Sequence, residues 1–535
     1  MPQALGELDM ALVPSVQGYI GKLPQELRLQ ICELLPGRAL KNLGLANKRW
    51  RKSSSTVLWK TFSSHLQERG RNFDALLLSP PDGFLDNVKN LKIILYSEVS
   101  EVSEVSEKVL QLITVLAQNT LRTVELPTVD PSTLGLLIRS QNLIEELAYQ
   151  QPAKKHGYGC PDSRFLVGNL QKLRKLTITP ANDDDFSAWL LNTPALETLN
   201  VAPYIESNRS NPKFGQLASL KRWKYPSTFI PLRLRHLRLS YINLFDGPYH
   251  LGKITDLQCL ADLEIRYCIN VSSFLEHLSI EYSALDSFAL KSLCLIQSSE
   301  EPDLVKFLDQ FIGCFSGLER LFVATRNPQH VNVENICLHG QTLQLLHLDP
   351  LYRPHRLPLS EARNHCYTAT ELETLLVGCP KIEELGIHVA AIDIRSMTRG
   401  VPFLFPREEN FAKTLDVIAR FPLLRSLRFT HLLALEENIE FDNPVEHAVQ
   451  YSQLATEVLR YLVARSSHVE VYTTSPTVPP GYLDMVEDFH GHQWPRYYYL
   501  RGTMTLPFRG QHRTEVVAVA VKKEDIAGHV LCPTS

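Results

Sequence analysis

One six-residue pattern, L-x-x-L-x-L, recurs along most of this chain of 535 residues. Successive side chains of an extended strand point to opposite faces, so each copy predicts a short strand with its apolar residues on one face. The copies follow one another at intervals mostly in the twenties to low thirties, stretching to about forty late in the chain. Clear copies start at Leu173, Leu196, Leu234, Leu260, Leu290, Leu318, Leu343, Ile382 and Leu424, and weaker ones start at Leu121, Leu143 and Leu220.

The intervals between these copies carry apolar residues at helical spacing. A strand and a helix in each interval resemble the leucine-rich repeat, whose usual period is about 20–29 residues. One repeat cannot bury its apolar edge alone, so the resemblance implies an α/β fold in which the repeats stack into a curved solenoid. An independent α/β domain fits less well, because the intervals carry no phosphate-binding glycine motif. The helical segments cover residues 108–117, 186–191, 303–315, 411–420 and 453–463.

A second pattern occupies residues 23–59. Proline suits the first turn of a helix, so Pro24 predicts a helix start, and Pro36 predicts its end. A second helix begins near Leu40, and a third carries Trp50. Three short helices bury little apolar surface alone, and the remainder suggests a partner. Leu27, Ile31, Leu34 and Leu35 recur at three- and four-residue steps and are expected on one face of the first helix.

The spacing LP-x-EL-x(3)-I-x-x-LL, followed by L-x-x-L, W-R and L-W, resembles the F-box. This helical module docks proteins onto the Skp adaptor of cullin-based ubiquitin ligases. The chain departs from the family pattern at Ala39, where an acidic residue is usual, and at Ala46-Asn47. The alternative is a helical N-terminal cap for the repeats. The resemblance implies an adaptor-binding role for Leu23, Pro24, Leu27, Ile31, Leu34, Leu35, Leu40, Trp50, Leu58 and Trp59.

These patterns divide the chain into four parts. We expect a mobile leader at residues 1–17, a three-helix F-box at 18–66, a leucine-rich-repeat solenoid at 67–475 and a C-terminal cap or extension at 476–535. An open solenoid end needs covering, and two further strands, at 496–506 and 513–521, are expected to provide the cover. The biased stretch Ser97–Glu107 is expected to be an exposed loop or an early helical extension.

The composition limits the classes of function. The net charge is -3, which gives no support for a nucleic-acid or membrane-surface partner. The ten cysteines include no CxxC pair, so free thiols in a reducing compartment are favoured over zinc sites or disulfides. We find no signal peptide and no apolar run of about 20 residues. The expected location is therefore cytoplasmic and/or nuclear.

No catalytic motif stands out. The sequence has no Walker loop, dinucleotide glycine fingerprint, G-x-S-x-G elbow or H-E-x-x-H motif. His490 and His492 could ligate a metal, but they fall in an expected loop, and we expect no metal site there. Asp183–Asp185 more simply places negative charge at a helix start. We therefore expect no enzyme activity, no metal and no cofactor.

The expected function is that of a substrate receptor, whose F-box binds a Skp adaptor, and through it a cullin, and whose repeats bind an unknown protein target. The rival is an interaction scaffold without ligase function. Residues between the hexad leucines should line the concave face, with a basic patch at Lys224, His236 and Arg238 for an acidic target. The alternative is that these charges only keep the sheet soluble. The concave set is Lys175, Thr177, Thr198, Asn200, Lys224, His236, Arg238, Asp262, Glu264, Arg320, Phe322, His347 and Arg428.

Overall fold

The structure is a computed structural model, and the chain forms two compact units, residues 1–196 and 197–535. It describes residues 23–66, 80, 84–95, 102–127, 129–150, 170–179, 189–202, 230–245, 248–285, 288–297, 299, 301–327, 329–350, 366–389, 409–430, 444–474, 486–487, 493–494, 497–508 and 511–526.

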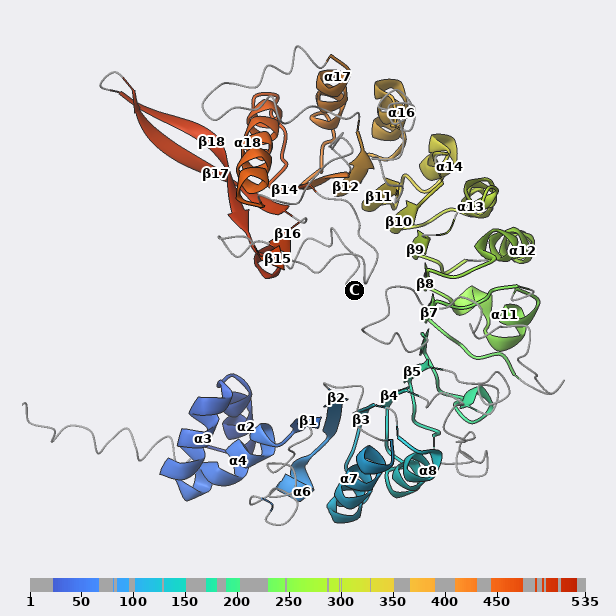
Figure 1. The fold of residues 1–535 in the computed structure, drawn as a ribbon, viewed down its shortest axis with the longest axis vertical. Coiled ribbons are helices and arrows are strands. Elements are labelled where there is room, and N and C mark those ends of the chain that lie inside the picture. Colours follow the sequence, from blue (N-terminus) through green and yellow to red (C-terminus); the bar gives the residue numbers. More distant parts are fainter. Residues whose placement is uncertain are drawn as a thin grey trace, which may run out of the picture. The chain divides into compact units, whose positions relative to one another are not determined.

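The first unit starts with three helices and continues as a parallel sheet (Figure 1). Strands β1 to β5 pair in chain order. The Asp130 side chain accepts hydrogen bonds from two backbone N–H groups in the first turn of α8, and proline occupies the next position, as is favoured at a helix start. The elements are α2 Gln25–Glu33, α3 Gly37–Ala46, α4 Lys48–Leu58, β1 Thr61–Leu66, α6 Phe84–Asn87, β2 Asn90–Leu95, α7 Val102–Val115, β3 Thr123–Leu126, α8 Pro131–Ser140, β4 Glu146–Gln150 and β5 Lys175–Thr179.

The second unit alternates strands and helices over most of its length. Strands β7 to β12 lie on its inner side and helices α11 to α17 on its outer side (Figure 1). The elements are β6 Thr198–Val201, β7 His236–Ser240, α11 Pro248–Ile254, η4 Leu257–Cys259, β8 Asp262–Arg266, α12 Val271–Ser283, β9 Ser292–Gln297, α13 Leu304–Gly313, β10 Arg320–Thr325, α14 Val333–Cys337, β11 Leu345–Pro350, α16 Ala369–Gly378, β12 Glu384–His388, α17 Glu409–Ile418, β13 Ser426–Thr430, α18 Pro444–Val463, β14 Val471–Thr474, β15 Val486–Glu487, β16 Gln493–Trp494, β17 Tyr497–Phe508, β18 Gln511–Val521 and η9 Lys523–Ile526.

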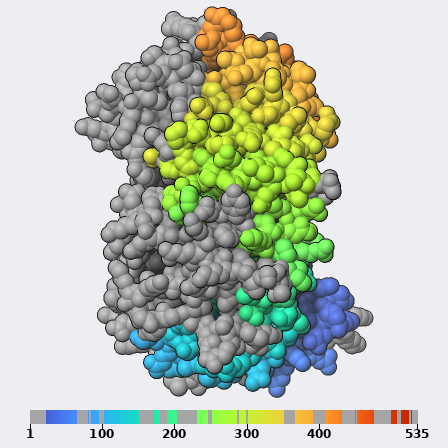
Figure 2. Space-filling view, turned by 90° about the vertical axis from the view of Figure 1, so that its right-hand side faces the viewer, coloured from blue at the N-terminus to red at the C-terminus, as the bar shows by residue number. Residues whose placement is uncertain are grey.

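Strands β6 to β14 are parallel and follow the chain order, which is the leucine-rich-repeat arrangement that the hexads predicted. Figure 2 shows the outer side, on which the colours of the second unit grade from green to orange in sequence order. In the described hexads the first, fourth and sixth positions form the core, except at Leu143, where the buried set is shifted by one residue to Ile144, Leu147 and Tyr149. Leu318, Leu321 and Val323, for example, are at most 4% exposed.

Most expected elements of the repeats are confirmed. The weak hexads at Leu121 and Leu143 lead into β3 and β4, while the one at Leu220 lies outside the described residues. The helix expected at 108–117 starts earlier, since α7 already includes Val102 from the biased stretch. The helix expected at 453–463 also starts earlier, at Pro444. Of the segment expected to be helical at 186–191, only 189–191 are described, and they are helical.

The C-terminal strands are also confirmed, and they change the direction of the sheet. Strand β17 pairs antiparallel with β14, and β18 pairs antiparallel with β17. Helix α18 packs against this hairpin, where the Thr456 hydroxyl accepts a hydrogen bond from Ala518 N at 3.1 Å. None of the described helices combines the length and the apolar character of a membrane-spanning segment.

Candidate protein-interaction surfaces

The three N-terminal helices have a small core that explains part of the F-box pattern. Cys32, Leu40 and Trp50 are buried at its centre, at 5% exposure or less. The side chains packed around them are Leu23, Leu35, Leu43, Val57 and Leu58. Leu40 and Trp50 therefore support the module from inside, and their contribution to a partner surface is indirect.

A separate set of apolar side chains on these helices is exposed. Leu27, Ile31 and Leu34 are 45%, 38% and 85% exposed, at helical spacing along and just after α2. Leu45 on α3 is 78% exposed and was not among the expected contact residues. Leu35 departs from the face expected for α2, because it follows the helix end and packs into the core. Several exposed aliphatic side chains on one helical face, unlike a single exposed one, are typical of an interaction surface.

Trp59 lies at the start of the repeats. Its ring packs edge to face on Phe84 at a centroid distance of 5.2 Å. Phe62 also packs on the Phe84 ring, at a centroid distance of 5.1 Å. Strand register places Phe62 opposite Leu91, so Trp59 stands opposite Val88, at the first position of a hexad. Trp59 thus serves as the first apolar residue of the first repeat.

The inner face of the second unit carries a network of cross-strand ion pairs. Asp262 Oδ2 lies 2.5 Å from His236 Nδ1, and Asp262 Oδ1 lies 2.8 Å from Arg320 Nη2. Glu264 Oε1 lies 3.3 Å from Arg238 Nε and also contacts Arg266. His236 and Arg238, which were predicted to form a basic patch for an acidic target, therefore belong to a network that mixes both signs of charge. Strand β8 places a carboxylate beside each of these residues, and Lys224 lies outside the described residues.

Access to this face varies along the unit. The side chains of His236 and Arg320 are 51% and 52% exposed. The expectation that every residue between the hexad leucines is accessible is wrong for Phe322, His347 and Arg428, which are at most 5% exposed.

His347 shows how this inner surface is packed. Its ring stacks on Phe322 at a centroid distance of 4.2 Å, and a Cβ on Gly386 would overlap it. Burial and the nearby Arg428 charge lower the pKa of His347 to about 4, so the ring is neutral at physiological pH. Asp349 Oδ2 lies 3.8 Å from both His347 Nε2 and Arg428 Nη2. His347, Asp349 and Arg428 are therefore part of the packed interior of strands β11 to β13.

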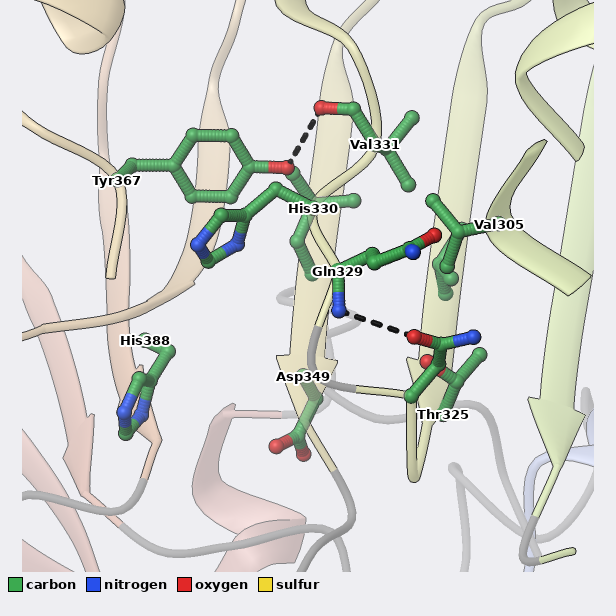
Figure 3. Close-up of a pocket in the computed structure, with 11 residues that line it drawn as sticks. Val305, Thr325, Gln329, His330, Val331, Asp349, Tyr367 and His388 are labelled. Carbon is green, nitrogen blue, oxygen red and sulfur yellow. Dashed lines mark hydrogen bonds between the residues drawn. The ribbon is translucent and has the colours of Figure 1, made fainter. Parts of the chain in front are cut away.

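A small, partly open hollow lies near the ends of β10, β11 and β12 (Figure 3). Its lining includes His330, Asp349, Tyr367 and His388. The Tyr367 hydroxyl donates to Val331 O at 3.0 Å, and burial raises the pKa of this phenol. Asp349 Oδ2 lies 3.8 Å from Arg428 Nη2, so Tyr367 and Asp349 both have contacts with the surrounding repeats.

The remaining candidates for chemistry are few. Among the described residues, no three His, Cys, Asp or Glu side chains are grouped to hold a metal ion. The eight described cysteines are free thiols. His490, His492 and Asp183–Asp185 lie outside the described residues.

Comparison with known proteins supports the description of the N-terminal segment. Residues 20–65 match the F-box-like family. No curated protein matches the chain in sequence. Among solved structures, the leucine-rich repeat-containing protein LegL7 from Legionella pneumophila is 10% identical, covering 79% of this chain and 94% of its own, with a TM-score of 0.26. The chain combines an F-box-like segment with a leucine-rich-repeat fold, the latter defined by its hexads and strand register.

Proposed function

We propose that this protein is a substrate-recognition subunit of a Skp–cullin–F-box ubiquitin ligase. The observation that carries the proposal is the exposed apolar stripe Leu27, Ile31 and Leu34 on a segment that matches the F-box-like family. The stripe would bind the Skp adaptor, while Leu40 and Trp50 would hold its helices in place. The repeats, joined to this segment through β1, would bind the protein to be modified.

In this role the chain supplies proximity rather than chemistry. F-box and leucine-rich-repeat proteins are typically non-catalytic adaptors. By holding its target near the transfer machinery, the receptor would make an encounter between two molecules effectively intramolecular. The function requires no metal or cofactor of its own, and the cytoplasm and the nucleus are the compartments we propose for it.

The adaptor surface can be tested with a charge placed in the stripe. In Leu27→Asp/Leu34→Asp, capture of a purified Skp adaptor should fall by at least about 30-fold, because apolar anchors at an interface centre often contribute ~2 kcal/mol or more. Leu338→Asp is a matched control, since Leu338 is 51% exposed after α14, on the outer side of the repeats. Both chains must retain native circular dichroism. Undiminished capture by the folded double variant would refute the adaptor surface.

The rival function is a scaffold that binds the adaptor, or only other proteins, without supporting ubiquitin transfer. The observation that favours this alternative is the departure from the F-box family pattern at Ala39, where an acidic residue is usual. Co-purification of a cullin with the native chain, but not with Leu27→Asp/Leu34→Asp, favours the ligase. Adaptor capture with no cullin at any concentration favours the scaffold.

For the target we propose the accessible inner face of β6 to β10. His236, Arg238 and Arg320 combine exposure with a fixed orientation, because each is held by a carboxylate of β8. A full chain carrying Leu27→Asp/Leu34→Asp should accumulate undegraded targets in cells. Adding Arg238→Glu/Arg320→Glu should then release them. Retention of the same proteins by the quadruple variant would move target recognition to another surface.

A further inference from the structure

The F-box-like helices differ sharply in charge from the rest of the chain. Residues 23–60 contain eight Lys or Arg and two Glu, a balance of +6. The whole chain has 55 Lys or Arg against 58 Asp or Glu, so the residues outside this segment balance at -9. A positively charged segment on a negatively charged protein steers an acidic partner towards that segment, because surface charge governs association.

The basic residues share faces with exposed apolar ones. On α3, Arg38, Lys41 and Leu45 are spaced by three and four residues, so they lie along one face, and all three are exposed. Lys48, exposed at the start of α4, follows Leu45 after three more residues. Not all the positive charges face outward for a partner, since Lys60 lies 3.4 Å from Glu33 and Arg28 donates to Arg49 O at 2.7 Å.

We infer that these helices dock on an acidic protein surface, and that the basic residues of α3 and α4 steer the association. The inference rests on the proposed function and adds to it the chemistry of the adaptor's docking face. That face should present Asp and Glu side chains around an apolar centre that receives the leucines. An apolar core with a polar rim is the usual anatomy of a protein interface.

A nucleic acid is the other polyanion that a +6 module could attract, and the side chains disfavour it. Proteins that hold single strands present aromatic rings on which bases stack. In this segment Trp50 is 3% exposed, and the Trp59 ring packs on Phe84. The exposed large side chains are instead the leucines and the isoleucine, which suit an apolar protein surface.

Steering by charge acts on the association rate. Charges of opposite sign raise encounter rates by about 10- to 1,000-fold at low salt, and added salt removes the effect. The screening length shrinks from about 30 Å at 0.01 M to about 3 Å at 1 M ionic strength. The association rate of the native pair should therefore fall at least ~10-fold between these two salt concentrations, with a much smaller change in the dissociation rate.

The test measures both rate constants for the full chain and a purified Skp adaptor by stopped-flow fluorescence at the two ionic strengths. Arg38→Glu/Lys41→Glu/Lys48→Glu should lower the low-salt association rate at least ~10-fold and abolish most of the salt dependence. The variant with Gln at the same positions should give intermediate values. The matched control Lys253→Glu/Lys306→Glu/Lys381→Glu changes the net charge equally at exposed positions of the second unit, and should behave like the native chain.

Three results would overturn the inference. Adaptor binding with a salt-independent association rate would leave the proposed function intact and remove only the steering. No adaptor binding at either ionic strength would remove both. Binding of a labelled single-stranded DNA oligomer more tightly than the adaptor at physiological salt, lost in the Glu variant, would assign the basic face to a nucleic acid. Circular dichroism of each variant verifies that the helices remain folded.

Discussion

The stacking of helices α14 and α16 depends on a contact between two glycines, and Gly340→Ala should break it. A methyl group on Gly340 would overlap the carbonyl oxygen of Gly378 and lie 2.7 Å from its carbonyl carbon. It would also lie 3.2 Å from Cys337 O. These neighbours are all backbone atoms, so no change of side-chain rotamer can relieve the overlap. The two repeats would have to separate.

The magnitude follows from this geometry. Overpacking a close-packed site costs about 1–3 kcal/mol, and a purely backbone clash belongs at the upper end. At roughly 2–4 °C per kcal/mol, the midpoint of unfolding should fall by about 6–12 °C. Because repeats are coupled mainly to their neighbours, the damaged interface should also split the transition into two steps.

Scanning calorimetry of the full chain would measure both effects. Gly313→Ala is the matched control, because α13 ends at this glycine and the nearest atom to a new methyl group is the side-chain atom Asn335 Oδ1 at 3.2 Å, which needs to shift by only a few tenths of an ångström. Its midpoint should lie close to the native one. A Gly340→Ala midpoint within about 1 °C of the native value would show that α14 and α16 can shift apart without cost, and would refute the reasoning.

Three further predictions concern the F-box core, helix capping and pH. Trp50→Ala should destabilise the N-terminal helices by about 3–5 kcal/mol, measured as protease sensitivity of residues 23–58, and equal resistance would contradict its burial. Thr368→Ala removes the capping box of α16 and should cost ~1 kcal/mol in urea unfolding, while Thr368→Ser should restore most of it. His339 accepts from Leu318 N and contacts Ile312 O, and burial lowers its pKa from 6.5 to about 4. Since the unfolded chain binds that proton more readily, stability should be constant above pH 6.5 and fall as the pH drops towards 4. A His339→Gln chain that loses stability equally over this range would assign the pH effect to other groups.

The repeat architecture was predictable because its signal is periodic burial. Leucine at the first, fourth and sixth hexad positions predicts a strand wherever it occurs. Strands β1, β2 and β14 were missed because other residues occupy those positions. Val88 occupies the first hexad position ahead of β2. In β14 the fourth position is Tyr472, which the register places opposite Leu427 of β13. A search that allowed any apolar residue in the hexad would have included β2, whereas β1 and β14 carry Ser64 and Thr474 at the sixth position.

The interaction surfaces were less predictable, because they depend on neighbours that are distant in sequence. The pairing of His236 with Asp262 follows only from the parallel register of β7 and β8. The hexad shows which residues leave the core, but it does not show what covers them afterwards. Phe322 and His347 occupy the same hexad position as Arg238, yet they are buried and it is not. On the F-box side, helical spacing alone could not separate the exposed Leu34 from the packed Leu35.

The junction between Leu58 and Thr61 leaves no room for a hinge. Helix α4 ends at Leu58, β1 begins at Thr61, and the carbonyl of Lys60 between them accepts hydrogen bonds from Lys89 N and Asn90 N. The first repeat is thus a rigid extension of the three-helix module, and any torque on those helices is transmitted to β1 and β2. A protein bound to the first unit would therefore be held at a fixed distance and orientation from a partner bound to α2. The distance that such an assembly spans is therefore set by the rigid geometry of the first unit rather than by a flexible linker.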